Sequence, residues 1–161
     1  MNIFVLDENP ILAARAHCDK HVTKMIVESA QMLSTAHCIL DGDKVDPRLY
    51  KIAYKNHPCT IWARECKGNY HWLYELFLNL SYEFNYRYDK VHKSWSTLHE
   101  ALFFPPTNIP PSEEIIARPM CMPIEFKKDG NAVTAYRKYY NWKQSQFSMV
   151  WTKRQPPTWL S

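Results

Sequence analysis

Glycine is scarce in this sequence, with 3 among 161 residues, and no phosphate-binding loop, nucleophile elbow or zinc-deaminase signature is present. No apolar run approaches the roughly 18 residues of a membrane span, so we expect no membrane partner. The segment 1–7 lacks the basic and apolar regions of a signal peptide. The 5 cysteines are an odd number without CxxC spacing. Free thiols in a reducing compartment are the simplest interpretation, and we expect a cytoplasmic protein.

The patterns that are present predict a mainly α fold, a compact single-domain helical bundle over residues 1–161. A short apolar run over residues 2–6 predicts a buried N-terminal segment or a short strand. Between residues 105 and 123, 6 prolines exclude a regular helix and predict an ordered connector before the last helix. Apolar periodicity and capping residues predict helices over about 11–40 with a bend near Cys18, 58–88 with a break near Gly68, 93–103 and 131–147.

One face of the first predicted helix carries four side chains that can do chemistry. His17, His21, Lys24 and Glu28 occupy positions i, i+4, i+7 and i+11. At 100° per residue they fall within about 60° of one another, beside an apolar stripe. Two imidazoles, an amine and a carboxylate at the edge of a buried stripe indicate the wall of a cleft. A solvated polar face is the alternative interpretation.

The stretch from Asn131 to Ser161 contains no acidic residue. Aromatic side chains alternate there with five cations, namely Arg137, Lys138, Lys143, Lys153 and Arg154. Cations bind phosphate and aromatic faces stack on exposed bases, so this pattern predicts a nucleic-acid surface. In the alternative interpretation, the aromatic side chains belong to the core and the cations only fringe it.

Asn56 and His57 directly precede Pro58, which predicts a helix start at which free backbone N–H groups attract anions. Arg64 follows two turns later and could add a phosphate contact. A simple helix cap is the alternative. His17 and His21 could also chelate a divalent ion, with His37, His57, Glu28 or a cysteine as further ligands, although no third ligand has diagnostic spacing.

Two motifs resemble one known family. They are Asp19-Lys20-His21-Val22-x-Lys24-Met25-x-x-Glu28-x-x-Gln31-Met32-Leu33 and Asn56-His57-Pro58-x-x-x-Trp62. Over about residues 15–90 the chain is similar to the pyrimidine-dimer DNA glycosylases of the phage endonuclease V type, and most of all to their small uncharacterised relatives. Near its end that enzyme carries an aromatic and basic run similar to Tyr136-Arg137-Lys138-Tyr139-Tyr140-x-x-Lys143.

This resemblance implies a compact α fold, no metal or other cofactor, and a DNA glycosylase that is also an abasic-site lyase. In the family, the α-amino group of the chain attacks the sugar carbon and forms a Schiff base. Glu28 then corresponds to the acid/base, with His21 as its neighbour. Asn2 should hinder removal of the initiator methionine, so Met1 supplies the amine, or Lys20 or Lys24 replaces it, or the lyase step is absent.

The partner that we expect is double-stranded DNA. The expected substrate contacts are His17, Lys24, Asn56, His57, Arg64, Arg137, Lys138 and Lys143. Trp62, Tyr70 and Trp72 could wall an extruded base or belong to the core. Two other functions stay open: a metal-dependent hydrolase or nuclease built on His17 and His21, and a non-catalytic nucleic-acid-binding protein.

Overall fold

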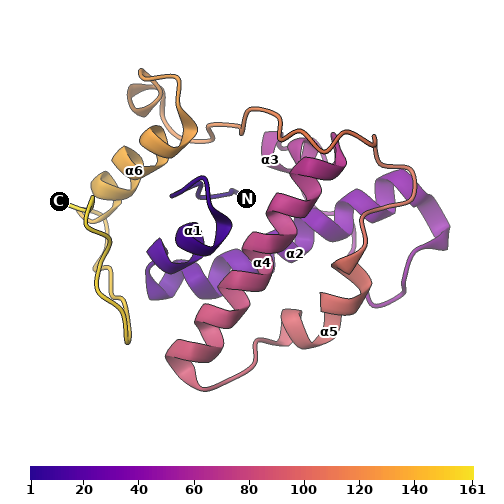
Figure 1. The fold of residues 1–161 in the computed structure, drawn as a ribbon, viewed down its shortest axis with the longest axis horizontal. Helices are drawn as coiled ribbons and strands as arrows, with labels where there is room; N and C mark the ends of the chain where they lie inside the picture. Colours follow the sequence, from indigo (N-terminus) through magenta and orange to yellow (C-terminus); the bar gives the residue numbers. More distant parts are fainter.

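The computed structural model describes residues 1–161 and consists of helices and loops without a strand, which confirms the mainly α prediction (Figure 1). Helix α4 packs against α1 and α2, and one hydrophobic cluster forms the core. None of the helices combines the length and apolar composition needed to cross a bilayer. The α-helices are α1 (Pro10–Ala16), α2 (Asp19–Asp41), α3 (Pro58–Trp62), α4 (Lys67–Tyr88), α5 (Lys93–Phe103) and α6 (Ala132–Lys143), with 3₁₀ turns at Gly42–Lys44 and Ile124–Phe126.

The first predicted helix is two helices, α1 and α2, separated at His17 and Cys18. Both residues have extended backbone conformations, so the prediction that His17 lies on one helix face with His21 is wrong. Distant side chains satisfy the backbone at the break. Arg87 donates to the His17 carbonyl at 2.8 Å, and the Cys18 N–H donates to the Tyr140 hydroxyl at 2.8 Å.

The second predicted helix also divides, because α3 ends at Trp62 and α4 begins at Lys67. The break therefore precedes Gly68, which lies inside α4. A Cβ atom at Gly68 would collide with the carbonyl oxygen of Glu113 in the connector. Glycine at this position lets the connector approach α4 closely, and the Gly68 N–H donates to the Ser112 carbonyl at 3.0 Å.

The proline-rich connector between α5 and α6 is ordered, as predicted, and runs over α3 and the start of α4 (Figure 1). The Trp62 indole donates to the Ile116 carbonyl at 2.9 Å, and the Asn69 side chain accepts from the Ile116 N–H at 2.9 Å. Trp62, Tyr70 and Trp72 are at most 5% exposed, so all three belong to the core and form no wall for an extruded base.

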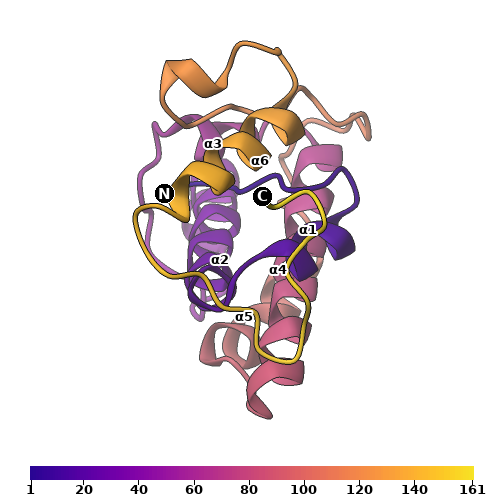
Figure 2. The ribbon, with the colours of Figure 1, turned by 90° about the vertical axis from the view of Figure 1, so that its left-hand side faces the viewer.

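The N-terminal segment 1–6 is extended, and its residues from Ile3 to Leu6 are buried, as predicted. Figures 1 and 2 both place this segment beside α6. The Phe4 ring stacks on His21 with 4.6 Å between ring centroids, and Arg137 of α6 donates to the Leu6 carbonyl at 2.8 Å. The beginning of the chain is thus held between α2 and α6.

Candidate functional site

Glu28 lies on the buried side of α2, where its carboxylate meets the start of the chain. Oε2 accepts the Asn2 N–H at 2.8 Å and lies 3.9 Å from the α-amino nitrogen of Met1. Oε1 is 3.5 Å from Nζ of Lys24, one helical turn away. Because the Glu28 side chain is only 12% exposed, these three nitrogens are its main electrostatic partners.

The first two residues are fixed by contacts with several elements. The Met1 side chain is 1% exposed and packs against the core, so the exposed part of Met1 is its main chain. The Asn2 amide donates to the Cys121 carbonyl at 3.0 Å, and its oxygen accepts from the Tyr136 hydroxyl at 2.8 Å. Helix α2, the connector and α6 together hold the α-amino group beside Glu28.

His57 caps α3 and lies near the same pair. Its Nδ1 accepts the Cys59 N–H at 3.2 Å. Partial burial lowers the pKa of His57, the positive Met1 amine lowers it further, and Glu28 raises it. The imidazole therefore lies in the electrostatic field of both groups, although no hydrogen bond joins it to either.

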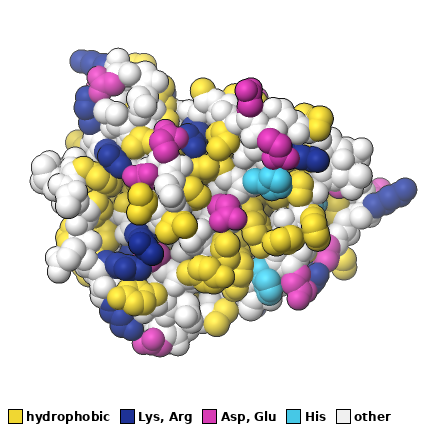
Figure 3. Space-filling view, viewed as in Figure 1, with side chains coloured by type: hydrophobic (Ala, Val, Ile, Leu, Met, Phe, Trp, Pro, Cys, Tyr) yellow, Lys and Arg dark blue, Asp and Glu magenta, His cyan; other side chains and the backbone are white.

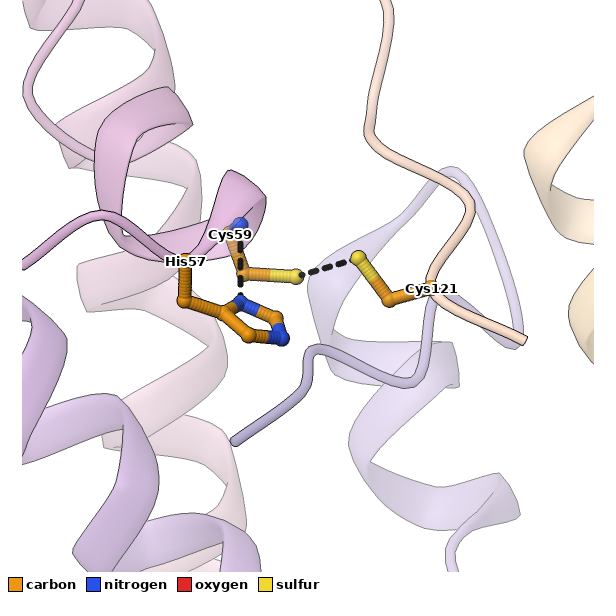
Figure 4. Close-up of side chains that lie close together, drawn as sticks. All are labelled: His57, Cys59 and Cys121. Atoms are coloured by element: carbon orange, nitrogen blue, oxygen red, sulfur yellow. Dashed lines mark hydrogen bonds between the residues drawn. The ribbon is translucent and has the colours of Figure 1, made fainter. Parts of the chain in front are cut away.

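Two cysteines that the sequence motifs do not include complete this neighbourhood (Figure 4). Cys59 is buried in α3, Cys121 is half-buried in the connector, and their sulfur atoms are 3.5 Å apart. The Cys59 thiol donates to the Cys121 sulfur, which raises the pKa of Cys59 and lowers the pKa of Cys121 to about 7. No local pattern connects these two positions, so sequence reasoning missed the pair.

His21 is buried and faces Tyr140, with its Nδ1 2.9 Å from the hydroxyl oxygen. Burial, together with the charges of His17 and three nearby lysines, lowers the pKa of His21 to about 3. The imidazole is therefore neutral at physiological pH. It has no hydrogen bond to Glu28, so its contribution to the site is to support the N-terminal segment through the stack with Phe4.

His17 has no exposed surface, and its Nδ1 donates to the Ala13 carbonyl at 2.6 Å. Burial lowers the pKa of His17 to about 4. A side chain enclosed in this way cannot contact DNA, which contradicts the expected substrate contact. No third histidine, cysteine or carboxylate completes a metal site with His17 and His21, so the predicted metal pair is not formed.

The acid-free stretch after Asn131 is less cationic in three dimensions than in sequence. Acidic residues from elsewhere neutralise four of its five cations, and on the face shown in Figure 3 basic and acidic side chains are intermixed. Arg137 and Lys138 thus have acidic partners in the folded chain, which the sequence pattern did not indicate, and their contact with DNA stays a prediction. The four ion pairs are Arg137 with Asp7, Lys138 with Asp129, Lys153 with Asp89, and Arg154 with Glu83.

Lys143 is the cation of this stretch without an ion pair, and its Nζ lies 4.9 Å from the centre of the Tyr139 ring. With Lys20 and Lys24 it surrounds His21, whose pKa all three lower. We call these three lysines the lysine rim. Among the aromatic side chains of the stretch, Tyr136, Tyr140 and Trp151 are core residues, whereas Trp142 is 44% exposed.

The remaining expected contacts, Asn56 and Arg64, lie on either side of α3. Asn56 is exposed in the turn before the helix. Arg64 donates to the Thr60 carbonyl at 3.0 Å and to the Lys55 carbonyl at 2.9 Å. The guanidinium of Arg64 therefore holds this turn in place, which the sequence did not indicate.

The family model described as pyrimidine dimer DNA glycosylase matches residues 1–97, which include Met1, Glu28 and His57 and cover more than half of the chain. No curated protein and no solved structure matches the chain.

Proposed function

Since the chain belongs to the pyrimidine dimer DNA glycosylase family, we propose that it excises a damaged or modified base from double-stranded DNA through the α-amino group of Met1, with Glu28 as acid/base. Family membership implies a DNA substrate and a role in DNA repair. The observation that supports the roles of Met1 and Glu28 is the distance of 3.9 Å between the Met1 α-amino nitrogen and the Glu28 carboxylate.

The chemistry follows from these two groups. The neutral amine attacks C1′ of the target nucleotide with its lone pair, and the base leaves with the electron pair of the N-glycosidic bond. The attacking nitrogen loses one proton to Glu28, and Glu28 passes this proton to O4′ as the C1′–O4′ bond breaks and the sugar ring opens. A protonated Schiff base then joins Met1 to C1′, and Glu28 is again a carboxylate. In the lyase step the same carboxylate accepts a proton from C2′, and the 3′ phosphate leaves.

The surroundings of Met1 support this residue, rather than a processed Asn2, as the source of the amine. Removal of Met1 would leave a cavity where its side chain packs against the core. Asn2 already uses its N–H and both polar side-chain atoms in hydrogen bonds with Glu28, Cys121 and Tyr136. Position 2 thus supports the site, and position 1 reacts.

The lysine rim supplies the cations that would contact phosphates next to the extruded nucleotide. Lys20 and Lys24 are exposed, and Lys24 lies one turn from Glu28. The exposed Trp142 ring, stacked on Tyr139 with 5.6 Å between centroids, offers an aromatic face beside Lys143. Protein and DNA would therefore meet over the start of α2 and the end of α6.

Borohydride trapping on a duplex with one abasic site tests the reaction, because reduction converts the Schiff base into a stable covalent bond. We expect a trapped complex whose modified peptide contains Met1, and we expect acetylation of the α-amino group to abolish it. Glu28→Gln should lower turnover by about 10²–10⁴-fold at unchanged folding. Glu75→Gln, an exposed helical glutamate without an ion pair, is the matched control.

The outcomes separate the alternatives. Trapping by acetylated protein would assign the nucleophile to a lysine, with Lys20 and Lys24 to be replaced next. Base release without any trapped complex would mean that Glu28 activates water instead. Unchanged activity in Glu28→Gln would exclude this carboxylate from the reaction, and DNA binding without any base release would leave a non-catalytic binding protein.

A further inference from the structure

Beside the proposed active site, three side chains with soft donor atoms converge without a function in the reaction. One donor atom from each of His57, Cys59 and Cys121 lies within 4.8 Å of the other two (Figure 4). His57 and Cys59 come from the start of α3, and Cys121 comes from the connector. In this structure they are the one group of three or more potential metal ligands that lie this close together.

We infer that His57, Cys59 and Cys121 bind a divalent cation of the zinc class. Thiolate and imidazole are the donors that Zn²⁺ prefers, whereas Mg²⁺ and Ca²⁺ require oxygen ligands. The two sulfur atoms are already 3.5 Å apart. Zinc–sulfur bonds of about 2.3 Å in a tetrahedral site need a similar separation, so binding requires only a small movement of the side chains.

The surroundings of the cluster allow a cation to enter and bind. Cys59 is buried, whereas His57 and Cys121 are half-buried, so the cation can enter from their side. Coordination through Nδ1 of His57 would replace one 3.2 Å hydrogen bond, from the Cys59 N–H, with a metal–nitrogen bond, whereas coordination through Nε2 would keep it. Three protein ligands leave a fourth position for water, as in zinc sites that keep an exchangeable ligand.

Binding at this position would connect the connector to α3 next to the N-terminal segment. The Cys121 carbonyl already accepts a hydrogen bond from Asn2, and the Cys59 thiol lies 3.8 Å from the Asn2 side-chain oxygen. A cation held by both cysteines therefore stabilises the segment that carries Met1. This inference does not depend on the proposed reaction, because binding is measured without DNA.

The test is Zn²⁺ binding to the reduced full-length protein, measured by competition with a chromophoric chelator. We expect one zinc per chain and a melting temperature that rises by about 5–10 °C at a hundredfold excess of zinc over Kd. Co²⁺ should give thiolate charge-transfer absorption. Loss of a residue that only hydrogen-bonds to a metal ligand typically weakens metal binding by roughly 10–100-fold. Cys121→Ser removes a ligand itself, so it should weaken zinc binding by more than this.

Cys38→Ser is the matched control, since Cys38 is a half-buried cysteine on α2 that lies outside the cluster, and it should bind zinc as the wild type does. Circular dichroism shows whether each variant is folded. Cys59→Ser tests the second thiol, but it changes a buried residue and could fail to fold. Cys121 is half-buried, so Cys121→Ser tests the site even in that case. Equal zinc affinity of wild type and Cys121→Ser would overturn the inference. A Cys59–Cys121 disulfide in air, with no zinc bound by the reduced protein, would replace it with a redox pair.

Discussion

Two sets of cations are candidates for contact with DNA: the lysine rim, and the paired cations of the acid-free C-terminal stretch. Variants of each set show which of them contributes to DNA affinity. A triple variant replaces Lys20, Lys24 and Lys143 with Gln, and a double variant replaces Arg137 and Lys138 with Gln. Lys20 and Lys143 have no ion pair, so their charges are available to phosphates. Arg137 and Lys138 are paired with Asp7 and Asp129, so their charges are already neutralised.

The expected magnitude follows from counterion release. Each phosphate contact contributes about 0.9 to the slope of log K against log salt concentration. Lys24 is paired with Glu28, so the two unpaired lysines of the triple variant should account for a flattening of roughly 1.8. Between about 50 and 200 mM salt, that difference corresponds to a roughly 12-fold change in the affinity ratio of wild type to variant. The double variant should change the slope by less than about 0.9, the value of one contact.

Fluorescence anisotropy with a duplex that carries a reduced abasic site measures these slopes without turnover. Thermal melting of each variant confirms that binding is compared between folded proteins. A larger change of slope in the double variant than in the triple variant would refute the assignment. It would mean that Arg137 and Lys138 exchange their carboxylate partners for phosphates when DNA binds.

Three further predictions concern stability. The pKa of His17 is about 4 in the folded protein and about 6.5 in the unfolded chain, so the unfolded chain binds more protons between these pH values. The contribution of His17 to the free energy of unfolding should therefore fall by roughly 3 kcal/mol as pH drops from about 6.5 to 4. Urea unfolding of the His17→Leu variant should lack this part of the pH dependence. Arg87→Met should lower the free energy of unfolding by about 3–5 kcal/mol, because the fully buried guanidinium pairs with Glu83 and Asp19, and an unchanged melting temperature would contradict this. Gly68→Ala should cost about 1–3 kcal/mol by forcing Glu113 away from α4, which calorimetry would detect.

Local signals predicted most of the helix boundaries. Asn9 caps α1 and His57 caps α3, each before a proline, and α2 ends before Gly42 with its positive φ of 65°. Helix α5 has the predicted bounds, from Lys93 to Phe103. These features depend on residues within one turn of the boundary, so the sequence pattern is sufficient to locate them.

The sequence pattern predicted breaks near Cys18 and Gly68, but the full separation of α1 from α2 and the position of the second break before Lys67 depend on distant residues. The chain leaves the helical conformation at His17 because Arg87, 70 positions later, satisfies its carbonyl. The ion pairs of the C-terminal stretch could not be predicted for the same reason, since the acids that form them lie outside the stretch. The position of Glu28 was predicted through the family motif, whereas the contacts of Asn2 with Cys121 and Tyr136 span 119 and 134 positions.

The packing of the N-terminal segment against α6 also sets an order of events during synthesis. Phe4 is made long before its partners Tyr136 and Tyr140, which come much later in the chain. At about 5–20 residues per second, the N-terminal segment waits for roughly 7–26 seconds before its binding place on α6 has been made. A nascent or truncated chain that lacks α6 therefore has an N-terminal segment without the contacts that hold it beside Glu28.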